Sequence, residues 1–222
     1  MVPAEAGGGR PINAVTEVTA AAVPVADQRV SRYGEPVPHT PALLVIDMQN
    51  ALVAIAHRAA ETVAVISGLR ERARAAGVPV VTVQQQDDEL EVGTERWRVT
   101  PELAPDAGET VVHKTSPDGF LGTDLDRTLR ALGVTEVVVT GFATEICVDT
   151  TARQALSHQY DVVLVADGHT TSVRPETGEY ASPNDSIAHH NEIFRHLGFP
   201  GRSIRVLPAS EVDFAATREP RR

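Results

Sequence analysis

Short hydrophobic runs alternate with longer amphipathic stretches along most of the chain, from Thr40 onward. Runs of about six apolar residues are typical of strands buried on both faces of a parallel sheet, and the stretches between them are typical of connecting helices. The runs predict strands at Ala42–Ile46, Val78–Val83, Thr110–His113, Glu136–Thr140, Asp161–Val165 and Ser203–Leu207. The stretches predict helices at Ala59–Ala76, Asp124–Leu132, Glu145–His158 and Ser186–Leu197. The pattern therefore predicts an α/β fold around a parallel sheet.

Glycine and proline mark several of the predicted boundaries. Gly77, Gly133 and Gly198 follow three of the predicted helices, where glycine accepts the left-handed conformation that commonly ends a helix. Residues 1–38 show no helical or strand periodicity and are rich in glycine and proline, which predicts a flexible N-terminal arm. We expect one domain over residues 39–216 and a short polar tail over residues 217–222.

Composition and charge exclude several classes of protein. The 222 residues are 42% hydrophobic and 23% charged, which is ordinary for a globular domain, and no apolar run approaches the roughly 18–20 residues of a membrane span. Acidic residues outnumber basic ones 30 to 20, and the net charge of −10 argues against a nucleic-acid partner. The single cysteine allows no internal disulfide, and the N-terminus does not resemble a secretory signal. We therefore expect a cytoplasmic protein without a membrane or nucleic-acid partner.

Three residues that can do chemistry follow three of the predicted strands. Asp47 comes after the first strand, Lys114 after the third, and Cys147 after the fourth, near the start of a predicted helix. Ligands of open α/β sheets bind outside the carboxyl ends of the strands, so these side chains are expected at one edge of the sheet. Taken separately, Asp47 fits a helix N-cap, Lys114 a solvated charge and Cys147 a small buried hydrophobe. Their coincidence at one edge favours a catalytic role.

These three residue types together can carry out nucleophilic catalysis on a small-molecule substrate. A free thiol has a pKa of about 8.5, and a neighbouring ammonium group and a helix N-terminus are expected to lower the pKa of Cys147 and favour its thiolate. A carboxylate such as Asp47 can accept the thiol proton and return it to a leaving group. We therefore expect Cys147 to be the nucleophile.

Three segments around these residues carry a recognisable pattern. They are Leu43–Asn50 (LLVIDMQN), Val112–Thr115 (VHKT) and Gly141–Arg153 (GFATEICVDTTAR). Together they resemble the isochorismatase-like cysteine hydrolase family, in order over about residues 40–210. The resemblance implies a three-layer α/β/α sandwich with a six-stranded parallel sheet, and a catalytic triad of Asp47, Lys114 and Cys147.

The same resemblance has further implications for the site and the assembly. It implies a cis peptide bond between Phe142 and Ala143, four residues before the cysteine. It also implies an oxyanion hole formed by the backbone amides of Ala143 and Cys147. Because members of the family are generally dimeric or larger, it implies a homodimer or a larger homo-oligomer.

The positions of the histidines argue against a metal site. Nicotinamidases resemble the chain at the triad but carry an Asp-x-His motif and another histidine after the second strand, which hold a metal. Here that stretch reads Val83–Glu89 (VQQQDDE), and no histidine occurs between His57 and His113. Imidazole is the usual zinc ligand, so neither a metal nor another cofactor is expected. His169, after the fifth strand, is a histidine that could approach the rim of the site.

The loop after the second predicted strand combines acidic residues with the only tryptophan. Five carboxylates lie within Asp87–Glu95, and Trp97 follows them. Such a run is either ordinary solvated surface or an acidic rim that attracts a cationic substrate, with Trp97 or Phe120 as a flat wall. The expected substrate-binding residues are Gln84, Asp87, Asp88, Trp97, Phe120 and Thr144.

The sequence thus predicts a cysteine hydrolase that cleaves a C–N bond of a small amide or lactam through a thioester. Isochorismatases proper cleave a vinyl ether and lack the nucleophile, so Cys147 argues against that activity. The loop segments resemble a bacterial subgroup of generic cysteine hydrolases. Streptothricin hydrolases, which open the lactam of a polycationic antibiotic, are similar to that subgroup. Two alternatives stay open: a hydrolase of another small carbonyl compound, and a non-catalytic binding or scaffold protein that retains the fold.

Overall fold

The computed structural model describes residues 39–173 and 181–214. The strands in these ranges are β1 (Pro41–Ile46), β2 (Val80–Gln85), β3 (Thr110–Lys114), β4 (Glu136–Phe142), β5 (Asp161–Thr170) and β6 (Ile204–Leu207). The α-helices are α1 (Asn50–Val53), α2 (Ala59–Ala75), α3 (Leu125–Ala131), α4 (Asp149–Ser157) and α5 (Pro183–His196). Two 3₁₀ helices, η1 (Pro101–Leu103) and η3 (Ala209–Glu211), and a π-helix, η2 (Thr144–Val148), complete these elements. The predicted arm (1–38) and tail (217–222) lie outside the described residues.

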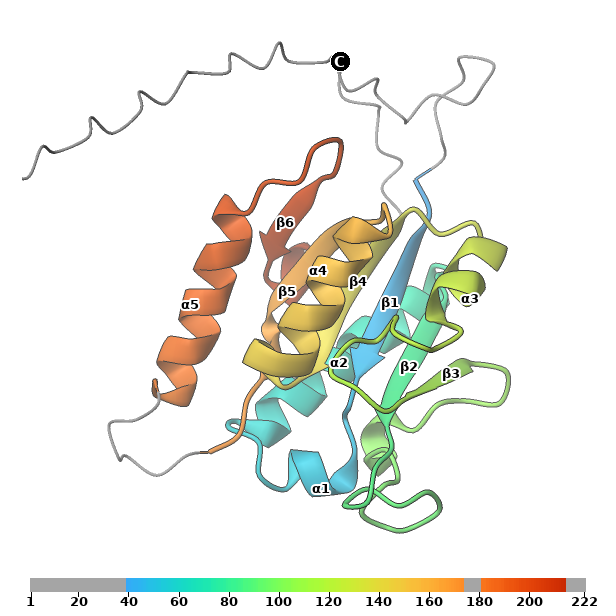
Figure 1. Cartoon of the computed structure of the whole chain (residues 1–222), viewed down its shortest axis with the longest axis vertical. Helices are drawn as coiled ribbons and strands as arrows, with labels where there is room; N and C mark the ends of the chain where they lie inside the picture. Colours follow the sequence, from blue (N-terminus) through green and yellow to red (C-terminus); the bar gives the residue numbers. More distant parts are fainter. Residues whose placement is uncertain (1–38, 174–180, 215–222) are drawn as a thin grey trace, which may run out of the picture.

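The strands form one parallel sheet in the order β3-β2-β1-β4-β5-β6. β1 and β4 lie in the middle, and the chain winds outward to β3 on one side and to β6 on the other (Figure 1). Helices α3, α4 and α5 pack on one face of the sheet, and α2 packs on the other. The structure is therefore the three-layer α/β/α sandwich that the resemblance implied.

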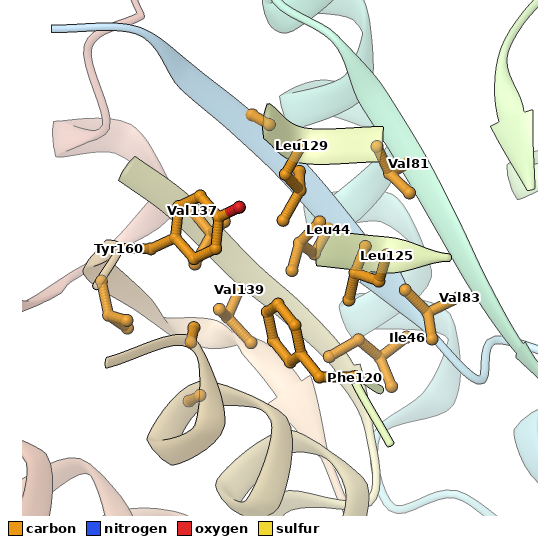
Figure 2. Close-up of a cluster of buried hydrophobic side chains, with 14 of the residues drawn as sticks. Leu44, Ile46, Val81, Val83, Phe120, Leu125, Leu129, Val137, Val139 and Tyr160 are labelled. Atoms are coloured by element: carbon orange, nitrogen blue, oxygen red, sulfur yellow. The ribbon is translucent and has the colours of Figure 1, made fainter. Parts of the chain in front are cut away.

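Alternate residues of the central strand β1 face the two helical layers. Leu44 and Ile46 belong to a core cluster that includes Leu125 of α3, as Figure 2 shows. Leu43 and Val45 belong to the cluster on the opposite face, which includes residues of α2. Successive side chains of a strand point to opposite faces, and here both faces are covered. This double coverage is why the predicted strands appear in the sequence as continuous apolar runs.

Each predicted strand and helix is present, with differences at several ends and in one helix. The predicted helix Glu145–His158 is divided into the π-helix η2 and the shorter α-helix α4. α5 begins ahead of the predicted range Ser186–Leu197, within the stretch Ser182–Asp185 that the sequence favours as a helix start. The hydroxyl of Ser182 caps it by accepting a hydrogen bond from the backbone N–H of Asp185 at 3.1 Å. α1 was not predicted. None of the helices in the described ranges is long and apolar enough to span a membrane.

β4 passes very close to the end of β1 at Gly141. This glycine has a φ of 125°, and a Cβ atom there would lie 2.1 Å from the carbonyl oxygen of Ile46. Only glycine adopts this conformation and leaves room for the neighbouring backbone. The register between β4 and β5 shifts at the same place, between Val139 and Gly141. The close approach brings together the ends of the two central strands and the residues that follow them.

Candidate active site

The carboxyl edge of the sheet brings Asp47, Lys114 and Cys147 together. Asp47 directly follows β1, Lys114 is the last residue of β3, and Cys147 lies in η2, which follows β4. Lys114 Nζ lies 2.7 Å from Asp47 Oδ2 and 3.4 Å from Cys147 Sγ. Lys114 therefore contacts both of the other residues that the sequence predicted as a triad.

Lys114 is a buried cation surrounded by acceptors. Its side chain is 0% exposed, and besides Asp47 and Cys147 its Nζ donates to Gln85 Oε1 at 2.7 Å and to the carbonyl oxygen of Ser116 at 3.1 Å. A buried ammonium group is tolerated only when it is paired and hydrogen-bonded. These partners hold Nζ in place, so the positive charge is fixed between the carboxylate and the sulfur.

Asp47 combines an unusual backbone conformation with one unpaired oxygen. Its φ is 53°, a left-handed value that is uncommon for residues other than glycine and occurs often at functional sites. Oδ2 pairs with Lys114, whereas Oδ1 is buried and has no hydrogen-bond partner in the described part of the chain. Burial raises the pKa of Asp47, and the charge of Lys114 opposes the rise. A carboxylate with a raised pKa and an oxygen that lacks a partner is suited to accept a proton.

The thiol of Cys147 is protonated near neutral pH. Burial raises its pKa to about 12, the negative charge of Asp47 adds to the rise, and the charge of Lys114 opposes it. Lys114 lowers the pKa as the sequence predicted, but the thiol pKa is raised overall, because burial and Asp47 outweigh Lys114. For the sulfur to act as a nucleophile, the thiol must give up its proton to a base as it reacts.

The turn that carries Cys147 is π-helical rather than the first turn of an α-helix. The carbonyl oxygen of Ala143 accepts hydrogen bonds from the backbone N–H of Ile146 at 3.0 Å and of Val148 at 3.1 Å. The second of these bonds spans five residues, as in a π-helix, and such turns are frequent at functional sites. The peptide bond between Phe142 and Ala143 is cis, which confirms the expectation from the resemblance.

A cavity of about 360 Å³ opens beside Cys147. Uncharged polar and thiol groups come from Gln85 and Cys147, and charged groups come from Asp47, Asp87, Glu89 and Arg96. The other lining residues are apolar: Ala51, Leu52, Ala54, Ile55, Leu90, Phe142, Ala143 and Ile146. Mostly apolar walls with a few polar groups are typical of sites for small molecules.

Among the residues predicted to bind substrate, Asp87 lines the cavity, whereas Gln84, Asp88, Trp97, Phe120 and Thr144 do not. Gln84 is buried, and its Nε2 donates to the carbonyl oxygen of Trp97 at 2.8 Å. Successive residues of a strand alternate in direction, so it is Gln85 that reaches Lys114 and the cavity. The prediction at this position is therefore displaced by one residue along β2.

Three of the other predicted substrate-binding residues have packing partners elsewhere. Phe120 is buried in the hydrophobic core next to β4 (Figure 2). Thr144 is buried, and its hydroxyl lies 2.8 Å from His169 Nδ1. The ring of Trp97 stacks on the ring of His113 with 5.6 Å between the ring centroids. A flat wall made of Trp97 or Phe120 is therefore not part of this cavity.

The acidic loop contributes less negative charge to the cavity than the sequence suggested. Within Asp87–Glu95 only Asp87 and Glu89 line it, and the cation Arg96 lines it as well. Both oxygens of Asp87 are engaged, one with Gln85 Nε2 at 3.0 Å and the other with backbone N–H groups of the loop. The hydrogen bond from Gln85 lowers the pKa of Asp87. Asp87 therefore organises the loop, and Glu89 and Arg96 are the charged groups left to face a ligand.

The sequence analysis missed two parts of the cavity: the wall formed by α1, and the side chain of Arg96. The loop before η1 folds back onto α1, where the backbone N–H of Asn50 donates to the carbonyl oxygen of Arg98 at 2.8 Å. The backbone N–H of Ala51 donates in the same way to Arg96 at 3.1 Å. A helix of four residues is too short to show a periodicity. The available signal was the apolar stretch of residues 51–56 directly after the conspicuous Asp47 segment.

Histidine is not part of the cavity lining. His169 is buried behind Thr144 and does not line the cavity. Over residues 39–173 and 181–214, no group of three or more His, Cys, Asp and Glu side chains is arranged to hold a metal ion. That the activity needs no metal or other cofactor stays a prediction.

The three-layer fold, with its site at the carboxyl edge of the sheet, is that of the isochorismatase-like hydrolases. The model of the Isochorismatase domain matches residues 41–184, and the chain belongs to this family. A structure of a cysteine hydrolase from Pseudomonas syringae pv. phaseolicola 1448A has the same fold, with a TM-score of 0.70 and 24% identity. That similarity covers 80% of this chain and 95% of the other.

Two kinds of named hydrolase are among the relatives. A streptothricin hydrolase from Streptomyces noursei is 38% identical over 188 residues, which cover 81% of this chain and 73% of that protein. A second streptothricin hydrolase from the same organism is 42% identical over 136 residues, 59% of this chain, and this match spans about half (49%) of that protein. Ureidoacrylate amidohydrolase RutB from Stutzerimonas stutzeri (strain A1501) is 29% identical over 218 residues, 77% of this chain and 88% of RutB.

Proposed function

We propose that the protein is a cysteine amidohydrolase that cleaves a C–N bond of a small amide or lactam through a thioester on Cys147. The observation that carries this proposal is the contact of buried Lys114 with both Asp47 and Cys147 beside a cavity. The names of the relatives, which include an amidohydrolase, support a carbon–nitrogen bond as the target.

In the proposed first half-reaction, Sγ of Cys147 attacks the carbonyl carbon while Asp47 accepts the thiol proton at Oδ1. Asp47 then gives this proton to the substrate nitrogen, the C–N bond breaks, and the amine leaves while the acyl group stays on sulfur. Lys114 stabilises the sulfur as it loses its proton and keeps Asp47 oriented. In the second half-reaction water attacks the thioester, which releases a carboxylic acid and restores the thiol.

We further propose that the developing oxyanion binds the backbone N–H groups of Ala143 and Cys147. Both residues line the cavity, which supports this assignment. In enzymes of this general type, removing one such donor costs about 3–4 kcal/mol of transition-state stabilisation.

The cavity restricts the substrate that we propose. Its volume of about 360 Å³ lies at the lower end of the range for small-molecule sites, roughly 300–1,000 Å³. The apolar walls favour a carbon skeleton beside the scissile bond. Glu89 supports the cationic group that the acidic loop suggested, such as that of a streptothricin-like lactam, whereas Arg96 reduces the negative potential.

A screen of small amides and lactams for released ammonia or amine tests this function. We expect the native protein to hydrolyse a member of the panel and Cys147→Ala to hydrolyse none, while both unfold at a similar temperature. Intact mass spectrometry of acid-quenched native enzyme is expected to show an acyl adduct on the only cysteine. Full activity in Cys147→Ala, or an inactive native protein across the panel, contradicts the proposal.

A further inference from the structure

A buried chain of hydrogen bonds ties the turn that carries Cys147 to β5 and α5. Thr144 Oγ1 lies 2.8 Å from His169 Nδ1, and His169 Nε2 lies 3.0 Å from Asn191 Oδ1. Asn191 Nδ2 donates to the carbonyl oxygen of Ala166 at 3.0 Å. Thr144 is 1% exposed, His169 2% and Asn191 8%, and none of the three lines the cavity. These hydrogen bonds therefore reach the site from the interior of the protein and not from the side that a substrate reaches.

The partners of Asn191 and His169 determine which atom donates in each of these hydrogen bonds. The amide NH₂ of Asn191 is engaged with Ala166, so its oxygen is the acceptor, and His169 carries its proton on Nε2. Burial lowers the pKa of His169 to about 4, so the ring is neutral near pH 7 and Nδ1 has no proton. The hydroxyl of Thr144 must then donate to Nδ1. A single proton arrangement satisfies all three side chains.

A second connection holds the same turn from the next residue. Glu145 accepts a hydrogen bond from Thr171 Oγ1 at 2.7 Å and another from Ser186 Oγ at 3.2 Å. Ser186 belongs to α5, as does Asn191. The first two residues of η2 are thus fixed to the end of β5 and to α5, three and two residues before the cysteine whose sulfur touches Lys114.

We propose that His169 is a positioning residue, which acts through Thr144 to hold Cys147 Sγ against Lys114 and Asp47. The consequence for catalysis rests on the proposed function, but the consequence for the thiol does not. If the hydroxyl of Thr144 is lost, the turn keeps only its connection through Glu145, and the sulfur moves from its half-buried place beside Asp47. Its pKa then falls from about 12 toward the ordinary value of about 8.5.

Alkylation of the thiol by iodoacetamide tests this proposal without a known substrate, because Cys147 is the only cysteine in the chain. We expect Thr144→Val to react faster than native protein at pH 8, about tenfold for each unit by which the thiol pKa falls. Thr144→Ser keeps the hydroxyl and is expected to react as the native protein does.

Thr140→Val is the matched control. Thr140 is also buried, and its hydroxyl donates a single hydrogen bond, to the carbonyl oxygen of Leu44 at 2.8 Å. This bond is not part of the hydrogen-bond chain through His169. We expect this variant to lose thermal stability but to keep the native alkylation rate. A native rate in Thr144→Val, or an equal acceleration in Thr140→Val, overturns the proposal.

Asn191→Ala provides a second variant that tests the proton arrangement directly. Without the amide oxygen, nothing selects the Nε2–H form of His169, so long-range ¹H–¹⁵N NMR is expected to show one tautomer in native protein and a mixture in the variant. A mixture already present in the native protein overturns the assigned arrangement.

Hydrolysis of an amide found by the screen separates this proposal from the proposed function. We expect Thr144→Val to lower kcat at least about tenfold with little change in KM, because most of the residues that line the cavity lie outside η2. Thr144→Ser is expected to restore kcat. Native kcat in Thr144→Val removes the positioning role and leaves the hydrolase intact. Failure of native protein to hydrolyse any amide refutes the proposed function, whereas the alkylation rates still decide whether the hydrogen bond between Thr144 and His169 positions the sulfur.

Discussion

Asp47 has two opposed effects on Cys147 at the scale of single residues. Its negative charge adds to the burial that raises the thiol pKa to about 12, yet in the proposed mechanism Asp47 is also the group that takes the thiol proton. Lys114 holds Asp47 Oδ2 at 2.7 Å, which leaves Oδ1 for that transfer. Replacing the carboxylate with an amide removes both the negative charge and the proton acceptor while it keeps the shape. The two losses act in opposite directions on two different measurements.

We predict that Asp47→Asn loses turnover and gains thiol reactivity. Loss of a general base lowers kcat by about 10²–10⁴-fold. Loss of the negative charge removes one cause of the raised thiol pKa, so the midpoint of the alkylation rate against pH moves to lower pH. Steady-state kinetics on the screened amide and the iodoacetamide rate at pH 8, which rises as the thiol pKa falls, measure the two effects.

Asp88→Asn is the control for this prediction, since Asp88 is exposed and does not line the cavity. It is expected to match native protein in both measurements. Near-native kcat in Asp47→Asn removes Asp47 from the mechanism. An unchanged alkylation rate shows that the charge of Asp47 does not contribute to the raised thiol pKa.

At the scale of elements, the contact between β1 and β4 depends on the absence of a side chain at Gly141. We predict that Gly141→Ala destabilises the protein by more than about 3 kcal/mol, because it adds a collision with the carbonyl oxygen of Ile46 to the cost of a positive φ. Urea unfolding followed by far-UV circular dichroism measures the loss.

Gly133→Ala is the matched control for the positive φ alone. Gly133 has a φ of 68°, and a Cβ atom there would meet no heavy atom within 4 Å. We expect a loss of about 1 kcal/mol, the ordinary cost of a left-handed alanine. Equal losses in the two variants show that the close approach at Gly141 does not contribute.

The strands and the meeting of three distant residues could be predicted because each follows from a local rule. Strands buried on both faces appear as apolar runs, and the ends of parallel strands share one edge, which places Asp47, Lys114 and Cys147 together. The choice between Gln84 and Gln85 could not be made, because the mostly apolar β2 gives no alternation to set the phase. The division of one predicted helix into η2 and α4 had no local signal either.

The cavity walls could not be predicted because contacts between distant segments determine them. α1 and the loop near Arg96 are joined by backbone hydrogen bonds across more than 40 residues and by the bridge between Gln49 and Val99. Charge counted along Asp87–Glu95 therefore overstated the charge at the cavity, since most of these carboxylates point elsewhere and a cation joins the wall. The charge at the cavity depends on where each charged side chain lies in the fold, and the order of residues along one loop does not give those positions.

At the scale of the whole molecule, the net charge of −10 gives the protein an overall negative field. Exposed charges act through a field that salt screens over about 8 Å at physiological ionic strength. Such a field changes how often a charged substrate is captured more than it changes the chemical step. Glu89 and Arg96 line the cavity and carry opposite charges, so replacing each of them tests the effect of charge at the cavity.

We predict opposite shifts in KM from Glu89→Gln and Arg96→Gln with a cationic amide. At low salt, Glu89→Gln is expected to raise KM about two- to fivefold and Arg96→Gln to lower it by a similar factor, with kcat near native. Addition of about 0.5 M NaCl is expected to reduce both shifts. Asp88→Asn and a neutral substrate of equal size are the controls. Equal KM values for all these variants at low salt mean that the loop does not select charge.

A half-buried, protonated thiol also affects how the protein withstands oxidation. Peroxides oxidise thiolates far faster than thiols, and the first product, a sulfenic acid, leads on to irreversible forms. With the pKa of Cys147 raised to about 12, almost no thiolate exists in the unoccupied site near neutral pH. In the proposed mechanism the reactive form arises only while Asp47 accepts the thiol proton and the sulfur attacks the substrate carbonyl. In this mechanism the sulfur is therefore less exposed to oxidation between turnovers.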